Sequence, residues 1–122
     1  MNEIGKIYHR PWGCYQTLML ADGYQVKMMT INPGGALSLQ KHQHRTEHWI
    51  VVKGTPIITV DKKASTYDIG ARALINKNTL HRAENHTTDP VVIIEVQLGD
   101  YLGEDDITRL HDIYKRNNDP NS

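Results

Sequence analysis

Turn signals interrupt this chain about every eight to twelve residues, and this spacing constrains its fold more than any other feature. The clearest are Asp22-Gly23, Pro33-Gly34-Gly35 and Gly54-Thr55-Pro56, whose residue types favour tight turns or interrupt a strand. The runs between the turns are short and rich in Val, Ile, Thr, Tyr and Trp, which suit a pleated strand. The pattern predicts an all-β fold, either a sandwich or a barrel.

The predicted strands cover residues 15–20, 24–32, 36–44, 47–53, 57–60, 66–69, 72–75, 81–84 and 91–98. Only the end of the chain looks helical. Asp105 and Asp106 suit the start of a helix, and Ile107, Leu110 and Tyr114 follow at helical spacing. We therefore expect a short helix over 106–116 that packs on the sheets, followed by a frayed tail.

Size and charge narrow the classes of function. The 122 residues predict one domain, 1–122, with a core of about 8–116. Acidic and basic residues balance at 14 each, so no nucleic-acid or membrane partner is expected, and a small charged metabolite fits better. One cysteine, Cys14, excludes an internal disulfide and fits a reducing compartment. Without an apolar signal core or a run of ~20 apolar residues, the sequence predicts a cytoplasmic protein.

A cluster of metal-binding residue types begins at His42. On the predicted strand, His42 and His44 share one face because side chains alternate with period two, and Glu47 follows three residues later. His81 lies about one hairpin further on. Imidazoles with one carboxylate suit a divalent transition metal, so these four residues are predicted to converge on one ion.

Glu95 lies in the middle of a strongly apolar strand. The even positions Val92, Ile94, Val96 and Leu98 are all apolar, whereas Glu95 and Gln97 lie on the odd face. A buried carboxylate is costly unless it is paired or faces a wet cavity. Glu95 therefore either pairs with a lysine on an exposed face or faces the same lumen as the metal. The apolar residues expected in the core or under cover are Leu18, Val26, Met28, Leu39, Trp49, Val51, Ile58, Leu74, Val92, Ile94 and Val96.

The two histidine clusters resemble the two motifs of the cupin superfamily. A glycine turn at Gly35 precedes His42 and His44, and six residues separate Glu47 from Gly54. The second motif has Gly70, then His81, and Asn85 after three residues. Its turn departs from the pattern, with Asn76 in place of proline and Asn78 in place of glycine. Asparagine tolerates the left-handed conformation that such a turn needs.

Most of the chain, about 8–116, resembles the type II phosphomannose isomerase domain. That domain is usually the C-terminal part of a bifunctional mannose-1-phosphate guanylyltransferase/mannose-6-phosphate isomerase. The segments that carry the resemblance are Arg10-Pro-Trp-Gly13, Tyr24-Gln-Val-Lys27, Leu37-Ser-Leu-Gln40, His44-Arg45, Glu47-His-Trp-Ile-Val-Val52, Gly54-Thr55, His81-Arg82, Glu84-Asn85, Ile94-Glu-Val-Gln97 and Tyr101-Leu-Gly-Glu-Asp-Asp-Ile107. The chain contains no glycine-rich nucleotide loop, so it looks like a stand-alone isomerase domain.

The resemblance implies a conical antiparallel β-barrel, or double-stranded β-helix, with a short C-terminal helix and one divalent metal. Zinc is the first candidate, and manganese, iron, cobalt and nickel stay open. The implied reaction interconverts mannose 6-phosphate and fructose 6-phosphate, with the metal polarising the sugar carbonyl. The residues expected to transfer the proton are Glu95, His48 or Glu84. Those expected to contact the phosphorylated sugar are Gln40, Arg10, Lys27, Arg45, Arg82, Gln97 and Arg109, and Gln40 is also a possible extra metal ligand.

Two other functions stay open. The chain could be a cupin that binds a sugar or sugar phosphate without turnover, or a metal cupin of other chemistry, such as a dioxygenase. Leu37, Leu39, Ile50 and Val52 supply apolar side chains opposite the predicted ligands. These side chains need a cover, either from the N-terminal segment or from a second subunit, and a homodimer is therefore expected.

Overall fold

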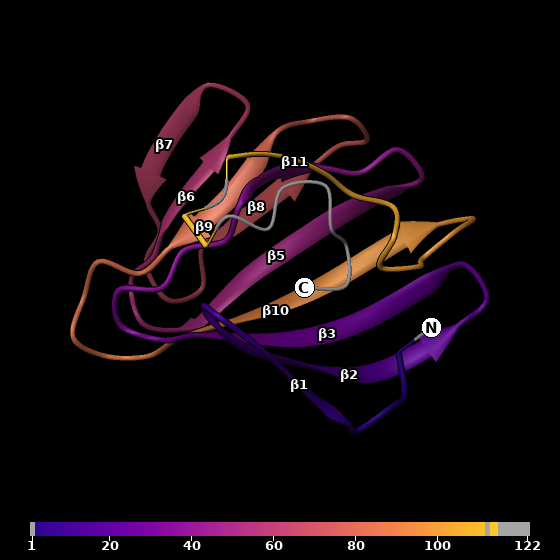
Figure 1. The fold of residues 1–122 in the computed structure, drawn as a ribbon, viewed down its shortest axis with the longest axis horizontal. Coiled ribbons are helices and arrows are strands. Elements are labelled where there is room, and N and C mark those ends of the chain that lie inside the picture. The colour runs from indigo at the N-terminus through magenta and orange to yellow at the C-terminus, as the bar shows by residue number, and fades with distance from the viewer. Residues whose placement is uncertain (1, 112, 115–122) are drawn as a thin grey trace.

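The computed structural model describes residues 2–111, 113 and 114. Across these residues the chain forms antiparallel strands in two sheets (Figure 1). The strands are β1 (Ile7–Arg10), β2 (Gly13–Ala21), β3 (Tyr24–Ile31), β4 (Leu39–Lys41), β5 (Arg45–Lys53), β6 (Ile57–Val60), β7 (Lys63–Thr66), β8 (Arg72–Ile75), β9 (His81–Glu84), β10 (Val91–Gly99) and β11 (Thr108–His111). The all-β prediction is confirmed.

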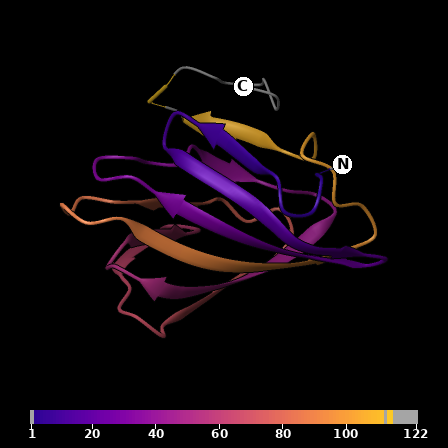
Figure 2. The ribbon, with the colours of Figure 1, turned by 90° about the horizontal axis from the view of Figure 1, so that it is seen from below.

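The larger sheet has the strand order β1-β2-β3-β10-β5-β8, and the smaller one β11-β4-β9-β6-β7. The tight turn at Asp22-Gly23 joins β2 to β3, with Gly23 at a φ of 86°. Figure 2 shows the strong twist of the long strands, with β10 in orange beside β3 in violet. Because β10 pairs with both β3 and β5, its inward side chains lie at the centre of the larger sheet.

The core lies between the two sheets, and the larger sheet contributes the odd-numbered side of β5 and β10 to it. Trp49 and Val51 from β5, Ile58 from β6 and Ile93 from β10 are all buried. Of the expected core, Trp49, Val51 and Ile58 are confirmed. Leu18 and Leu74 are exposed instead, and the half-buried members are Val26, Met28, Leu39, Val92, Ile94 and Val96.

The even-numbered apolar residues of β10 are partly covered on the outer side of the sheet, and the odd-numbered side of the strand faces the core. Both sides of this strand carry apolar side chains, so alternation alone does not show which side is inside. The buried side carries Val91, Ile93, Glu95 and Gln97, and the even side faces outward. The lumen is therefore more polar than a hydrophobic pattern would predict.

The strand predicted over 36–44 is much shorter in the structure. Only Leu39–Lys41 forms β4, and residues 42–44 form a turn that leads into β5. The predicted strand 66–69 is displaced, because β7 follows β6 directly across the turn at Asp61 and Lys62. Asn78 adopts a φ of 61°, which confirms that asparagine takes the left-handed position expected at that turn.

The predicted C-terminal helix is wrong for the described residues. Thr108–His111 forms β11, which pairs with the edge strand β4. Leu110 is 55% exposed, so the helical spacing of Ile107, Leu110 and Tyr114 does not define a buried face. The free backbone groups of β4 provide a partner that a short, weakly periodic segment takes in preference to a helix. The remaining residues of that prediction, 112, 115 and 116, lie outside the described part.

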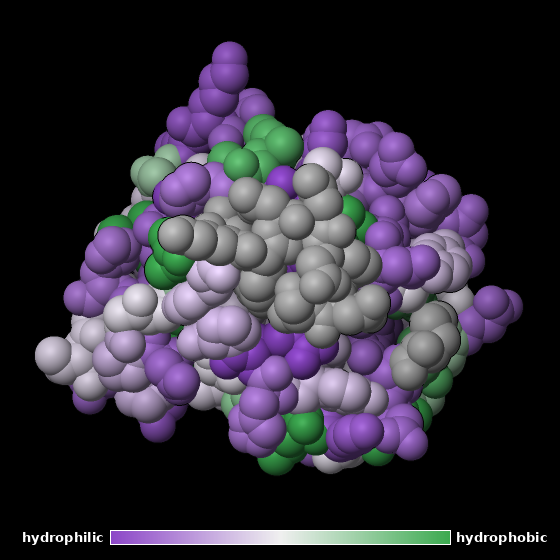
Figure 3. Space-filling model, in the orientation of Figure 1, coloured by the Kyte–Doolittle hydropathy of each residue, from purple (hydrophilic) through white to green (hydrophobic). Residues whose placement is uncertain are grey.

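The described part of the chain contains no helix that is long and apolar enough to cross a bilayer. Hydrophilic residues cover most of the coloured surface in Figure 3, and hydrophobic residues appear there as small separate patches.

Candidate metal centre

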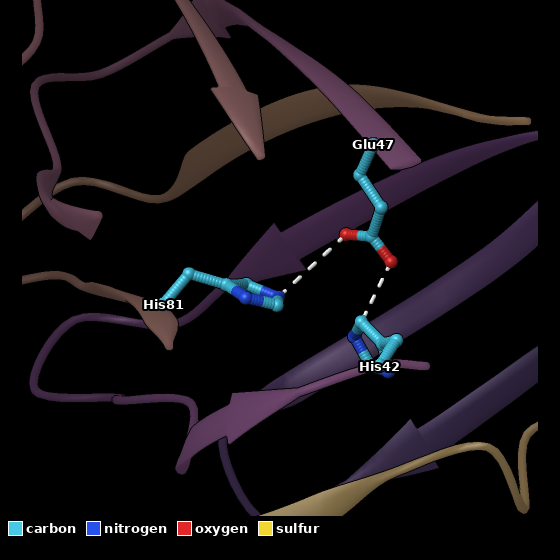
Figure 4. Close-up of side chains that lie close together, drawn as sticks. All are labelled: His42, Glu47 and His81. Atoms are coloured by element: carbon cyan, nitrogen blue, oxygen red, sulfur yellow. Dashed lines mark ion pairs between the residues drawn. The ribbon is translucent and has the colours of Figure 1, made fainter. Parts of the chain in front are cut away.

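Three buried side chains converge at one point of the lumen. His42 comes from the turn after β4, Glu47 from β5 and His81 from the start of β9. Nε2 of His42 lies 3.3 Å from Oε2 of Glu47, and Nε2 of His81 lies 3.8 Å from Oε1. Figure 4 shows the Glu47 carboxylate between the two rings. One ligand atom from each residue lies within 4.8 Å of the others, close enough for a single ion to bind all three.

Both histidine rings are oriented by backbone carbonyl groups. Nδ1 of His42 lies 2.6 Å from the carbonyl oxygen of Asp106, and Nδ1 of His81 lies 2.8 Å from that of Thr79. A carbonyl only accepts, so each Nδ1 carries the proton and donates it. Each Nε2 therefore presents its lone pair towards Glu47. Metal-binding histidines in proteins are commonly held in this way.

The Glu47 carboxylate is held by two further donors. Oε2 accepts a hydrogen bond from Nε of Arg45 at 2.7 Å, and Oε1 accepts one from the indole of Trp49 at 2.9 Å. Nη2 of Arg45 also lies 3.3 Å from Nε2 of His42. Arg45 therefore places a positive charge against two of the three candidate ligands.

The charges in this cluster favour the forms that bind a metal. Burial lowers the pKa of His42 to about 4, and burial also lowers the pKa of His81. Burial alone would raise the pKa of Glu47, but the Arg45 guanidinium and the two imidazoles hold it well below its usual range. Neutral imidazoles beside an ionised carboxylate are the ligand forms that a transition metal requires.

The residues present fit a metal ion. Nε2 of His81 is buried, and within the described part of the chain it makes no hydrogen bond. An unsatisfied buried acceptor is costly, and a cation at this point would satisfy it together with His42 and Glu47. The candidate ligand set is therefore two imidazoles and one carboxylate.

His44 does not join this cluster, in contrast to the prediction. About half of its side chain is exposed, and its ring contacts Tyr101 edge to face at 6.0 Å between centroids. The prediction relied on strand alternation, but residues 42–44 form a turn, where side chains two apart do not share a face. The correct partner of His42 is Glu47, from the following strand.

An open pocket of about 580 Å³, counted out to the solvent at its mouth, adjoins the cluster. Five of the residues expected to contact the sugar line it: Arg10, Lys27, Gln40, Arg45 and Arg109. Glu95 also lines the pocket and is 3% exposed, so it lies in the lumen. Burial and the nearby Glu47 carboxylate raise the pKa of Glu95 to about 8.

Lys27 and Glu104 form a pair at the wall of the pocket. Nζ of Lys27 lies 3.3 Å from a carboxylate oxygen of Glu104 and 4.0 Å from the ring centroid of Tyr15. Burial would raise the pKa of Glu104, but the Lys27 ammonium, followed by the Arg45 guanidinium, lowers it. Cationic side chains such as Lys27 and Arg45 therefore lie next to carboxylates such as Glu104 and Glu47 in the pocket lining.

Besides His44 and His81, four predicted site residues lie outside the pocket lining. His48 has the opposite parity to Glu47, so it is exposed on the outer face of β5. Arg82 and Glu84 lie on the outward side of β9, where they form an ion pair at 3.5 Å. Gln97 is fully buried and bonds to Glu95 rather than lining the pocket. Glu95 is therefore the one of the three expected proton-transfer residues that the structure brings to the metal cluster.

The sequence interpretation missed Glu104 and the role of Asp106. Asp106 was expected to cap a helix, but its carboxylate accepts hydrogen bonds from the backbone N–H groups of Gln43 and His44, both at 2.9 Å. The acidic run Glu104-Asp105-Asp106 was the available signal. Its contacts reach residues about sixty positions earlier, which no local pattern reveals.

The comparisons with known proteins agree with this geometry. The family model described as the C-terminal part of mannose-6-phosphate isomerase matches residues 2–112. The chain belongs to this family. The resemblance to the phosphomannose isomerase domain is thereby confirmed.

Several curated proteins are similar to this family member. The alginate biosynthesis protein AlgA of Pseudomonas aeruginosa is 47% identical over 112 residues, which cover 92% of this chain and 23% of AlgA. The xanthan biosynthesis protein XanB of Xanthomonas campestris pv. campestris is 45% identical over 91% of this chain and 24% of its own length. A mannose-1-phosphate guanylyltransferase of Sinorhizobium fredii is 39% identical over the whole chain and 24% of that protein. The chain thus spans about a quarter of the length of these relatives.

Solved structures show the fold. A cupin-2 domain from Rhodospirillum rubrum has a TM-score of 0.67 at 17% identity, covering 74% of this chain and 62% of that one. The oxalate decarboxylase of Lactobacillus farciminis has a TM-score of 0.74 at 18% identity, covering 86% of this chain and 33% of that one. The predicted cupin fold is confirmed.

Proposed function

We propose that this chain is a metal-dependent aldose–ketose isomerase that interconverts mannose 6-phosphate and fructose 6-phosphate. The observation that carries the proposal is one pocket that His42 and Glu47 of the candidate metal cluster line together with the buried Glu95 and several cations. Membership of the mannose-6-phosphate isomerase family supports the same substrate class.

His42, Glu47 and His81 would hold the ion, with Gln40 close by in the pocket lining as a possible fourth ligand. Zinc is the first candidate, although this ligand set also suits manganese, iron, cobalt and nickel. When bound, the ion supplies Lewis acidity towards the carbonyl oxygen of the sugar.

The chain's own residues account for the other requirements of the reaction. In its ionised form, Glu95 takes the proton from carbon 2 of the aldose and returns it to carbon 1, while the proton of the hydroxyl group on carbon 2 passes to the oxygen on carbon 1, which yields the ketose. A bound dication would lower the pKa of Glu95 and favour this ionised form. The cations of the pocket, Arg10, Lys27, Arg45 and Arg109, bind the phosphate of the substrate. Trp12 and Trp49 line the same pocket and limit the access of water to the reacting carbons.

A coupled assay tests this function. The protein is loaded with zinc, given mannose 6-phosphate, and followed for fructose 6-phosphate formation before chelation, after chelation and after the metal is restored. We expect turnover that chelation abolishes and zinc restores. Binding of mannose 6-phosphate without turnover would contradict the proposal and indicate a sugar-phosphate-binding cupin. Oxygen consumption with ferrous iron and an organic substrate would instead indicate a dioxygenase.

Replacement of Glu95 tests the assignment of the proton-transfer residue. Glu95→Gln keeps the volume of the side chain and removes its carboxylate. We expect the variant to fold and retain metal, and to lose turnover by about 10²–10⁴-fold while substrate binding changes little. Steady-state kinetics and metal analysis measure both quantities. Near-normal turnover would remove Glu95 from the mechanism, and failure to fold would show that its carboxyl group is mainly structural.

A further inference from the structure

Four buried side chains form a continuous hydrogen-bonded chain behind the pocket. Oγ1 of Thr17 donates to Oε1 of Gln25 at 2.8 Å, and Nε2 of Gln25 donates to Oε1 of Gln97 at 2.8 Å. Nε2 of Gln97 then donates to Oε2 of Glu95 at 2.9 Å. None of the four is more than 3% exposed. The chain therefore ends on the residue that we assign to proton transfer.

The strand register explains how these side chains meet. Gln97 in β10 lies directly opposite Gln25 in β3, and both point into the lumen. Glu95 precedes Gln97 by two residues, so the two share the same face of β10. Thr17 extends the line onto β2, where it is completely buried. The hydrogen-bonded chain thus crosses three adjacent strands of a rigid sheet.

All three hydrogen bonds run in the same direction, towards Glu95. A side-chain amide has one accepting end and one donating end, so each partner determines the orientation of the next. A reversed Gln97 would set its carbonyl oxygen against a Glu95 oxygen, and its NH2 group against that of Gln25. Nδ2 of Asn2 also donates to Oε1 of Gln25, at 3.2 Å, which strengthens the same orientation.

Gln25 and Gln97 do not belong to the pocket lining, whereas Glu95 does. Any effect of the two amides on a bound sugar therefore passes through the Glu95 carboxyl group. We propose that Gln97 and Gln25 are positioning residues: Gln97 binds one oxygen of Glu95, Oε2, Gln25 orients Gln97, and together they fix the orientation of the Glu95 carboxyl group beside Glu47 in the pocket. This assigns Gln97 a role different from the substrate contact that the sequence predicted.

The proposal rests on the proposed isomerase function, and three variants test it. Gln97→Met removes the donor to Glu95 and keeps a similar volume. Gln25→Glu is nearly isosteric but replaces the amide donor, so the Gln97 amide should turn and face Glu95 with its oxygen. Gln16→Met is the matched control, because Gln16 lies on the other side of β2 and bonds to the carbonyl oxygen of Gly5 at 2.9 Å.

We expect both Gln97→Met and Gln25→Glu to lower kcat by about 10–100-fold, since small displacements of a reacting group have effects of this size. KM and zinc content should change by less than about twofold. Gln16→Met should match the wild type. If the two variants lose zinc or thermal stability but keep normal kcat per bound zinc, the amides are merely structural and the proposal is wrong.

A second measurement does not depend on turnover. In the wild type, the Gln97 side-chain NH2 group should exchange slowly with solvent, and its NMR signals should shift in Gln25→Glu. Exchange as fast as that of the exposed Gln43 would overturn the proposed arrangement. If the wild type isomerises nothing but these signals behave as expected, the proposed function fails while the hydrogen-bonded chain stands.

Discussion

Glu47 shows how one residue organises a site through its two oxygens. One oxygen faces His42 and Arg45, and the other faces His81 and Trp49. Side chains alternate between the two faces of β5, and its odd-numbered residues face inward. The carboxylate of Glu47 therefore points into the lumen. The candidate cluster therefore combines Glu47 from β5 of the larger sheet with two histidines from the smaller sheet: His42 follows β4, and His81 begins β9.

Replacing His81 and His44 one at a time offers a test at this scale, because only His81 belongs to the candidate cluster. His81→Gln removes a candidate ligand, so we expect zinc affinity to fall by at least about 100-fold. His44→Gln is the matched control and should leave the affinity within about twofold, because His44 is half exposed and outside the cluster. Competition with a chromophoric chelator measures both. Equal losses in the two variants would show that His44 also binds the ion.

At the scale of elements, the segment between β10 and β11 connects distant parts of the site. Glu104 pairs with Lys27 of β3, Asp106 binds the turn at residues 42–44, and β11 pairs with β4. The carbonyl oxygen of Asp106 also orients His42. This segment therefore forms one wall of the pocket and supports a candidate ligand.

Asp106 is expected to affect the metal although it does not touch it. Asp106→Asn leaves only one accepting oxygen for two backbone N–H groups. We expect a loss of about 1–3 kcal/mol in the free energy of unfolding and a loss of about 10–100-fold in zinc affinity. Denaturant unfolding and chelator competition measure these effects. Asp105→Asn is the control, since the Asp105 side chain bonds to exposed Tyr101, and a similar effect there would contradict the assigned role of Asp106.

The Lys27–Glu104 pair should make stability depend on pH. The folded pKa of Glu104 lies below its usual value of 4.5, so the pair stabilises the fold above that pH. This contribution is lost as the pH falls through the folded pKa. The difference in unfolding free energy between wild type and Glu104→Gln should therefore be largest near neutral pH and shrink below 4.5.

Denaturant unfolding at a series of pH values measures this difference. Glu3→Gln is the matched control, because Glu3 pairs with Lys6 on the surface, where its side chain is 70% exposed. Its difference from the wild type should stay nearly constant with pH. A constant difference for Glu104→Gln as well would contradict the role of the pair.

At the scale of the whole molecule, the outer face of the larger sheet is largely apolar. It carries Ile50 and Val52 from β5, Leu74 from β8 and Leu98 from β10, all at least 38% exposed. Strand register sets Ile94 beside Ile50 at the centre of this face. The earlier expectation of a dimer also used Leu37, which is buried in the core instead.

We expect a second copy of the chain to cover this face. The four long strands of this sheet, β2, β3, β10 and β5, lie about 4.8 Å apart with about four outward residues each, which gives a flat footprint of about 500 Å². The side chains raise its accessible area towards the ~800 Å² per partner of a stable interface. The charged residues among the paired outward positions of β5, β8 and β10 are Lys53 and Arg72, and most of the other positions are apolar, so the face suits a copy of itself.

Light scattering after gel filtration tests this expectation. Ile50→Lys should convert a dimer to a monomer, because it buries a charge in the interface. Ile69→Lys is the control, since Ile69 is 67% exposed and lies in the turn that follows β7. A monomeric wild type, or a dimer that survives Ile50→Lys, would contradict this arrangement.

The all-β class, most of the strands and the three residues of the candidate metal cluster could be predicted from the sequence. These features depend on local chemistry: turn residues at Asp22-Gly23 and Asn78, β-branched runs such as 91–98, and imidazoles near a carboxylate. Glu95 was also recognisable, because a carboxylate in an apolar strand is costly without a reason.

Four other features depend on contacts between segments that are far apart in the sequence. His44 lies outside the cluster because residues 42–44 form a turn and do not continue β4. Both sides of β10 carry apolar side chains, so only the packing of the smaller sheet shows which side is buried. The predicted helix became β11 because β4 offers an open edge. Asp106, Gln25 and Gln97 take their roles from partners far along the chain, and contacts over such separations are set by how the sheets close, which local patterns do not encode.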